Sequence, residues 1–329
     1  MEANDTLTAV KGVAVGSFSD PEHLTGCTVV RFPVEGAVAG VDVRGSAPGT
    51  RETDSLNPLN LVERIHALVL TGGSAFGLDA AGGVVQCLEE EGIGLDTGGG
   101  IRVPIVPAAV LYDLTAGSSS VRPGRAQGFE ACKDARVDPV PLGNVGAGTG
   151  ATVGKVMGMD RAMKSGLGSS ARELPGGAVV AALAAVNGLG DVVDPRSGRI
   201  LAGTRGDRKG EFLDSTRLLL EQSERTLFAG TNTTLAVVAV NVPFNKTQLT
   251  KIARMAHDGL ARAIRPVHTM VDGDTVFAVS VPQEEAAPSL DITVAGTAAA
   301  EVLAEAVVRG VTSAGSLGGF PCRSDWEEA

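Results

Sequence analysis

Three consecutive polar residues, Asn232, Thr233 and Thr234, stand directly before an apolar run and could supply a nucleophile. Attack of the Thr233 hydroxyl on the carbonyl carbon of Asn232 would give an ester through an N→O acyl shift, and hydrolysis would free Thr233 as a new N-terminus. The new α-amine, with an ordinary pKa of ~7.7–8.0, could then act as the base for the hydroxyl of the same residue. The alternative is a Thr-rich start of a strand, and these residues alone leave both interpretations open.

The segment Asp272-Gly273-Asp274 offers a pair of carboxyl groups. Residues two apart in an extended strand share a face, and two carboxylates so placed raise one another's pKa. One carboxyl could then carry a proton while the other fixes a neighbouring ammonium or hydroxyl. The alternative is a hairpin turn made by Asp-Gly.

The glycine-rich segment from Gly146 to Lys155 admits three interpretations. As a phosphate loop it fails, because Thr149 stands where the first glycine belongs and Val156 replaces the hydroxyl residue that would hold magnesium. A glycine-rich backbone that crowds a reaction site, with Lys155 pointing into it, is the better functional interpretation. A plain flexible loop with a surface lysine is the third.

Other routes to hydrolytic chemistry are not supported by the sequence. Ser74 is no nucleophile elbow, because Phe76 occupies the position where that motif needs glycine. The four histidines and four cysteines are scattered without metal-ligand spacing, so we expect no metal and no cofactor.

Composition and charge exclude several classes of partner. The net charge of −10 argues against nucleic acid, whose binders need clustered Lys and Arg. The longest apolar run, Ala178–Val186, is too short for a membrane span, which needs ~20 residues. The acidic start lacks the features of a signal peptide, and the dispersed cysteines are typical of reduced, mostly buried thiols, so we expect a cytoplasmic protein.

The elements that must position these residues alternate between strands and helices, which predicts an α/β architecture with helices on the outside. The apolar runs predict strands at Thr28–Phe32, Ala67–Leu70, Ala178–Val186, Thr234–Val242 and Thr275–Val281. Periodic spacing predicts helices at Ser74–Glu91, Leu213–Glu224, Thr247–Ile264 and Val294–Val308.

Together these motifs resemble the L-aminopeptidase/D-esterase family of self-cleaving N-terminal-nucleophile hydrolases, which includes the β-peptidyl aminopeptidases and the nylon-oligomer (6-aminohexanoate-oligomer) endohydrolases. The resemblance covers roughly residues 10–312. The segments that carry it are Leu70–Ala81, Val103–Asp113, Val145–Lys155, Asn232–Thr234 and Val267–Ala278.

The resemblance implies a single domain over residues 1–329, folded as a four-layer α/β/β/α sandwich of the N-terminal-nucleophile hydrolase type that the ornithine acetyltransferases also share. Cleavage between Asn232 and Thr233 would give an α chain of residues 1–232 and a β chain of residues 233–329, which stay associated, often in a homotetramer. The substrate would be a small peptide or amide.

The resemblance also assigns roles to single residues. Thr233 would be the nucleophile, Asn187 would help to form the oxyanion hole, and Lys155 would lie near the nucleophile. Tyr112 would be an active-site tyrosine, and Asp272 and Asp274 would position the nucleophile and its amine.

The sequence leaves more than one substrate and more than one reaction class open. Thr233 with paired aspartates is the pattern of the nylon-oligomer hydrolases, whereas Gly72–Leu78 and Lys164–Ser169 are more similar to the aminopeptidases. An α-peptide, a β-peptide, a D-amino-acid ester and a 6-aminohexanoate oligomer therefore all remain open. An acyltransferase that resembles the ornithine acetyltransferases, and a nucleotide-binding protein that uses Gly146–Lys155, are the competing functions.

Overall fold

Strand β16 (Thr233–Val240) lies in the middle of the molecule and is buried along its whole length. This computed structural model describes residues 4–221, 232–283 and 287–327. Leu235, Val237 and Ala239 face one apolar core, and Ala236, Val238 and Val240 face another. A strand covered on both faces is a nearly continuous apolar run, which is why the sequence reveals it.

β16 belongs to a six-stranded mixed sheet. It pairs antiparallel with β13 and parallel with β18. The order across the sheet is β12 (Leu167–Glu173), β13 (Val179–Asn187), β16, β18 (Thr275–Ser280), β3 (Ala37–Val43) and β5 (Arg64–Ile65).

A second, five-stranded sheet packs face to face on the first. Its order is β1 (Ala14–Asp20), β2 (Thr25–Arg31), β6 (Ala67–Thr71), β9 (Ala108–Val110) and β4 (Thr50–Arg51). Leu68 and Leu70 of β6 share one core with Leu183 of β13 and Phe277 of β18. This core fills the space between the two sheets.

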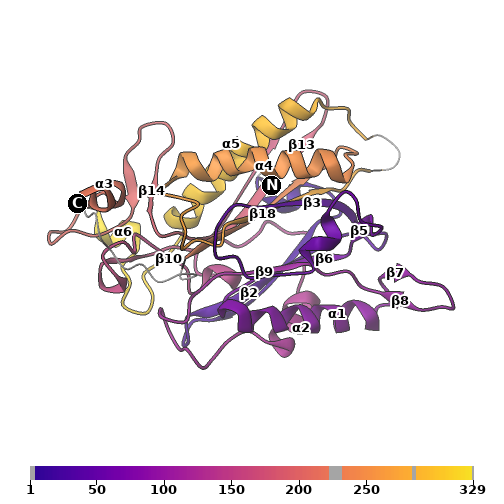
Figure 1. The fold of residues 1–329 in the computed structure, drawn as a ribbon, viewed down its shortest axis with the longest axis horizontal. Helices are drawn as coiled ribbons and strands as arrows, with labels where there is room; N and C mark the ends of the chain where they lie inside the picture. The colour runs from indigo at the N-terminus through magenta and orange to yellow at the C-terminus, as the bar shows by residue number, and fades with distance from the viewer. Residues whose placement is uncertain (1–3, 222–231, 284–286, 328–329) are drawn as a thin grey trace.

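Helices cover the two outer faces. Along one side lie α1 (Ala80–Glu90) and α2 (Arg125–Lys133), and along the other lie α4 (Lys246–Ala263) and α5 (Ile292–Thr312) (Figure 1). Helix α4 begins with a capping box, in which the Asn245 side chain accepts the backbone N–H of Gln248 and the Gln248 side chain accepts that of Asn245. The predicted four-layer α/β/β/α sandwich is therefore confirmed.

Smaller elements lie at the edges of the layers. The strands are β14 (Asp191–Val193), β15 (Ile200–Ala202) and β17 (Ile264–Arg265) in one sheet, and the pairs β10 (Thr152–Val153) with β11 (Met163–Lys164) and β7 (Leu95–Asp96) with β8 (Arg102–Val103). Two short helices are α3 (Ser215–Glu221) and α6 (Arg323–Trp326). The 3-10 helices are η1 (Leu7–Ala9), η2 (Thr53–Leu56), η3 (Ser74–Asp79), η4 (Gly146–Gly148) and η5 (Met159–Arg161).

All four predicted helices start at a different residue from the observed ones, and two of these differences have a cause in the backbone. Residues Ser74–Asp79 form the 3-10 helix η3 before α1 begins, because the chain enters with positive φ at Gly73 and Ser74 and turns tightly against the preceding strand. The helix predicted at Leu213–Glu224 begins at Ser215, since Asp214 has a φ of 56°, and its residues 222–224 lie outside the described residues. Among the residues that the structure describes, no helix is both long and apolar enough to span a bilayer.

Candidate active site

Three strand ends meet at Thr233. Because β13 runs antiparallel to β16, the last residue of β13, Asn187, lies directly opposite Thr233. Because β18 runs parallel to β16, the segment Asp272–Asp274 just before β18 lies beside Asn232 and Thr233, and Asn232 pairs with Asp272 in a β-bridge. Sheet pairing thus gathers residues that are far apart in the sequence.

The carbonyl group of Asn232 is held between two donors. The Thr233 hydroxyl donates to its oxygen, and the backbone N–H of Gly273 donates to the same oxygen at 3.0 Å. Thr233 is only 3% exposed. A Cβ atom at position 273 would lie 2.7 Å from Thr233 Oγ1, so glycine allows this close approach. The carbonyl beside the predicted cleavage point is therefore polarised, with the hydroxyl next to it.

The two aspartates have separate partners. Asp274 Oδ1 accepts the backbone N–H of Thr234 at 2.7 Å, and its Oδ2 accepts the backbone N–H and Nδ1 of His268, at 3.1 and 2.8 Å. Asp272 Oδ2 accepts the backbone N–H and hydroxyl of Thr269, at 2.8 and 2.5 Å. Burial and the neighbouring Asp274 raise the pKa of Asp272.

The Asp-Gly-Asp segment is not a hairpin turn. The strand before it, β17, belongs to a different sheet from β18, so the two strands do not pair with each other. The carboxyl side chains of Asp272 and Asp274 are both buried, at 1% exposure. Of the two interpretations of this segment, the pair of buried carboxyl groups agrees with the structure.

Asn187 is fixed in orientation by a network. Its Oδ1 accepts the backbone N–H of Thr152 at 3.0 Å and Lys155 Nζ at 2.9 Å, and its Nδ2 donates to the carbonyl of Tyr112 at 3.0 Å. Lys155 Nζ also donates to the backbone carbonyl of Asn187 at 3.0 Å. Burial lowers the pKa of Lys155 to about 7, although Asp272 and other buried carboxylates oppose this shift. Lys155 therefore points inward, as the sequence predicts, and reaches the residue opposite Thr233.

A cavity of about 110 Å³ opens beside Thr233. Three separate segments line it: residues 47–49 after β3, Ser74 and Ala75 in η3, and Val110 to Tyr112 at the end of β9. Tyr112, Thr233, Asn187, Lys155, Asp272 and Asp274 are thus brought into one region at the ends of the strands. The cavity is the space in which a small acyl group could approach the Thr233 hydroxyl.

The glycine-rich loop before Lys155 is occupied by another lysine. Lys164 is fully buried, and its Nζ donates to the carbonyl oxygens of Gly148 and Ala151, at 3.0 and 2.9 Å, and to that of Ser165. The loop therefore presents carbonyl oxygens to an ammonium group. Carbonyl oxygens repel a phosphate, so this loop does not suit one. The Gly146–Lys155 segment is the motif behind the nucleotide-binding interpretation, which the structure therefore does not support.

Sequence reasoning missed several residues of this region. The backbone N–H of Gly273 carries no sequence signal, and Ser74 was considered only as a nucleophile. Asp113 follows Tyr112 directly; its Oδ1 accepts the Gly73 N–H at 2.7 Å, and burial raises its pKa to about 6. His268 is not among the missed residues: it lies near the aspartate pair in the sequence, which favours a structural hydrogen bond over a role in the site, and its ring is hydrogen-bonded to Asp274.

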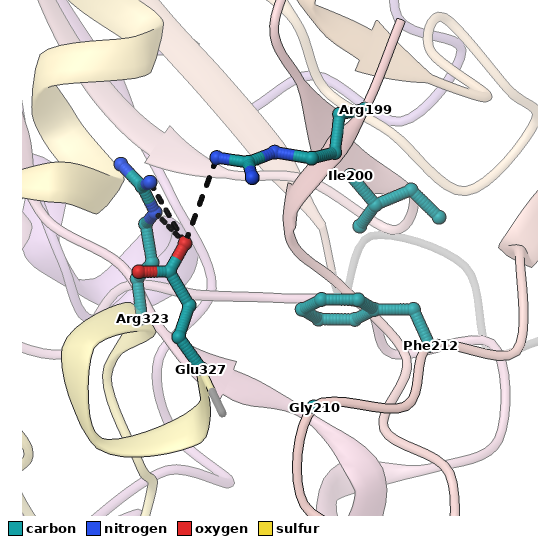
Figure 2. A pocket seen from close by; sticks show the side chains of 6 residues that line it. All are labelled: Arg199, Ile200, Gly210, Phe212, Arg323 and Glu327. Carbon is teal, nitrogen blue, oxygen red and sulfur yellow. Dashed lines mark hydrogen bonds and ion pairs between the residues drawn. The ribbon is translucent and has the colours of Figure 1, made fainter. Parts of the chain in front are cut away.

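A larger cavity, of about 640 Å³, lies elsewhere and shares no lining residue with the Thr233 cavity (Figure 2). Its two guanidinium groups point toward one carboxylate: Arg323 Nη2 lies 2.8 Å and Arg199 Nη2 lies 3.8 Å from Glu327 Oε1. Its described lining residues include no Ser, Thr or Cys. In residues 4–221, 232–283 and 287–327, no group of three His, Cys, Asp or Glu side chains is placed to hold a metal ion.

Comparison with known proteins identifies the family of the chain. The model of peptidase family S58 matches residues 5–324. The chain belongs to peptidase family S58. The family resemblance drawn from the sequence is therefore confirmed, and the protein is a peptidase or amide hydrolase.

The similar proteins are named either as aminopeptidases or as 6-aminohexanoate-oligomer endohydrolases. An uncharacterised aminopeptidase of Mycobacterium tuberculosis is 42% identical, over 98% of this chain and 97% of the relative. A 6-aminohexanoate-oligomer endohydrolase of Paenarthrobacter ureafaciens is 33% identical, over 90% of this chain and 83% of the relative. Both branches considered from the sequence are thus represented.

Solved structures support the fold. The L-aminopeptidase D-Ala-esterase/amidase of Ochrobactrum anthropi, described as a variant of the N-terminal-nucleophile hydrolase fold, superimposes with a TM-score of 0.69 at 20% identity, over 97% of this chain and 89% of that chain. A β-aminopeptidase of Burkholderia sp. gives a TM-score of 0.67 at 20% identity, over 96% and 89%.

Proposed function

We propose that this S58 chain cleaves itself between Asn232 and Thr233 and then hydrolyses small linear amides with Thr233 as nucleophile. The observation that carries the proposal is the carbonyl of Asn232, whose oxygen accepts both the Thr233 hydroxyl and the Gly273 N–H. A nucleophile and an oxyanion donor at one carbonyl group are the two requirements of acyl transfer.

Self-cleavage would proceed in two steps. In the first, Thr233 Oγ1 bonds to the carbonyl carbon of Asn232, the C–N bond breaks, and the proton that the hydroxyl loses passes to the nitrogen, which becomes the α-amine of Thr233. In the second, water adds to the resulting ester, so that Asn232 leaves as a carboxylate and the hydroxyl is restored. The Gly273 N–H would hold the negative charge on the oxygen during the first step.

In turnover, the free amine would take the proton from the Thr233 hydroxyl as it attacks the substrate carbonyl. Asn187 has a second amide N–H besides the one that Tyr112 accepts, and it would stabilise the oxyanion. Asp274 would hold the amine, and Lys155, whose pKa is about 7, would keep the Asn187 amide oriented and could exchange a proton at neutral pH.

The cavity limits the substrate that we propose. A volume of about 110 Å³ accommodates a short acyl group between Tyr112 and Pro48, and the amine side of the amide would extend outward. The names of the relatives make a peptide with a free amino terminus and a 6-aminohexanoate oligomer the first two candidates. Acyl transfer to ornithine, the competing chemistry, is not favoured by the comparisons.

Location and assembly are part of the same proposal. The four cysteines are free and buried, which supports a cytoplasmic protein. Exposed apolar side chains, among them Leu59 at 91%, Leu61 at 93% and Ile101 at 62%, support association into the homotetramer that the resemblance implies. Light scattering of the purified protein would measure the number of chains.

Purified protein tests the central step directly. We expect a denaturing gel to show two bands whose masses sum to 33.3 kDa, and N-terminal sequencing of the smaller to begin Thr-Thr-Leu. Hydrolysis of a panel of amino-acid amides, β-alanyl amides and 6-aminohexanoate oligomers then identifies the substrate. A single intact chain after prolonged incubation would contradict self-cleavage.

A further inference from the structure

His268 occupies an unusual backbone position next to Asp274. Its φ is 57°, in the left-handed region that residues other than Gly adopt uncommonly, although His, Asn and Asp are enriched there. From there both its backbone N–H and its ring Nδ1 reach the same oxygen, Oδ2 of Asp274, at 3.1 and 2.8 Å. Strain of this kind persists where the surrounding contacts require it, and it gathers at functional sites.

The hydrogen-bond partners assign the protons on the ring. A carboxylate oxygen only accepts, so Nδ1 of His268 must carry the hydrogen. Behind it stands a second buried histidine, His257 of α4, with the ring centroids 4.7 Å apart in an edge-to-face arrangement. His257 Nε2 faces the carbonyl oxygen of Asp42 at 3.0 Å, and burial lowers the pKa of His257 to about 4, so this neighbour stays neutral near pH 7.

The contacts of His268 with Oδ2 also fix the direction of Oδ1, the other carboxylate oxygen of Asp274. Because His268 supplies two donors to Oδ2, the carboxyl group cannot rotate without losing both of them. Oδ1 is then held toward β16, where it accepts the Thr234 N–H at 2.7 Å. Thr234 directly follows Thr233, whose nitrogen would become the amine after cleavage, so Oδ1 is fixed one residue away from that nitrogen along the chain.

We propose that His268 is a positioning residue for self-cleavage and turnover. Its Nδ1 and its backbone N–H hold Asp274 Oδ2 in place. Asp274 Oδ1 is thereby directed toward the start of β16, where it accepts the Thr234 N–H and where the amine of Thr233 would form after cleavage. The proposal rests on the proposed function of Thr233. A purely structural role would depend on the size of the side chain. A positioning role instead requires a hydrogen-bond donor at the position of Nδ1, and its effect on the rate passes only through Asp274.

Four variants at position 268 separate the effect of backbone strain on self-cleavage from the effect of the side-chain hydrogen-bond donor. H268G relieves the strain and removes the donor, whereas H268N also tolerates a positive φ and places an amide N–H where Nδ1 stood. H268Q keeps the size of the side chain but puts its N–H near the position of Nε2, and H268A lacks any side-chain donor. Self-cleavage is followed on denaturing gels from the start of expression, and melting temperature reports folding.

We expect H268G, H268A and H268Q to cleave about 10- to 100-fold more slowly than the wild type, the range for losing a hydrogen bond to a charged group. H268N should cleave within about threefold of the wild type, since its donor replaces Nδ1. In the matured protein, kcat should fall in the same order with KM changed less than about twofold, because the contact acts on the nucleophile and not on the substrate.

A second experiment checks that the effect passes through Asp274. In a D274A background, H268G should slow cleavage no further, because the side chain that His268 positions is gone. Wild-type rates in H268G and H268Q, an H268N no faster than H268G, or additive effects in the double variant would each overturn the proposal. An uncleaved wild-type chain would instead contradict the proposed function, so the two failures are distinguishable. If H268G proves unfolded, comparing the cleavage rates of H268N and H268Q tests the proposal instead, because only H268N places a donor at the position of Nδ1.

Discussion

Replacing Gly273 by alanine tests the geometry of self-cleavage with one methyl group. The φ of Gly273 lies outside the left-handed region, so alanine brings no backbone strain. Its Cβ atom would stand 2.7 Å from Thr233 Oγ1 and 2.8 Å from the carbonyl oxygen of Ala47. Ordinary contact begins at 3.4 Å, so the hydroxyl or the strand must move by about 0.7 Å.

The displacement sets the size of the expected effect. A misplacement of ~1 Å at a reacting group can cost ~10²-fold in rate, so a shift of this size predicts self-cleavage about 10- to 100-fold slower. Overpacking a buried position costs typically ~1–3 kcal/mol, which a chain of this size should survive folded. The G273A protein should therefore accumulate as an intact, folded precursor.

The assay compares G273A with a matched control. Gly315 also has an ordinary φ, but a Cβ there would meet its nearest neighbour, Asn144 Nδ2, only at 3.8 Å. We expect G315A to cleave like the wild type on a denaturing-gel time course, with melting temperature recorded for both variants. If G273A cleaved as fast as G315A, the carbonyl of Asn232 would not react in the position that the structure gives it.

Three further outcomes follow from the same site. T233A should abolish both self-cleavage and amide hydrolysis, measured by gel and by product formation, while its melting temperature shows an intact fold. N187A should lower amide hydrolysis by ~10²-fold or more, as expected for a lost oxyanion donor, and near-full activity would remove its role. The folded-state pKa of Lys155, about 7, lies below its ordinary value of 10.5, so the unfolded chain binds more protons between these two pH values. In the T233A precursor, stability should therefore rise with pH across this window, and K155M should remove that part of the rise in denaturant titrations.

The strands that build the site could be predicted from the sequence for a physical reason. β13, β16 and β18 are covered on both faces, so each is an apolar run that ends where the chain meets polar site residues. The predicted strand Ala178–Val186 differs from the observed Val179–Asn187 by one residue at each end. Thr233 is a polar residue beside such a run and is a candidate for that reason, whereas the role of Asn187 comes from the family resemblance.

The contacts between these ends could not be predicted. Asn187 meets Thr233 through an antiparallel pair, and Gly273 meets Asn232 through a parallel one, and both depend on the order of strands in the sheet. Local periodicity carries no information about that order. His268 is the same kind of case: its distance from Asp274 in sequence suggests proximity, but the positive φ that turns it onto Oδ2 leaves no trace in the residue types.

If the chain cleaves itself as proposed, the charges at the site would make the precursor and the mature protein differ in more than one covalent bond. In the precursor, burial raises the pKa of Asp272 and lowers that of Lys155, because neither charge is well solvated between the layers. Cleavage adds an amine to Thr233 beside the same carboxyl groups. Its positive form would favour ionised Asp272 and disfavour a second ammonium on Lys155, since opposite charges within a few ångströms attract and like charges repel strongly in a buried site. Ionised Asp272 in turn favours the charged form of Lys155, so the effect of the new amine on Lys155 would be the balance of these two opposing interactions.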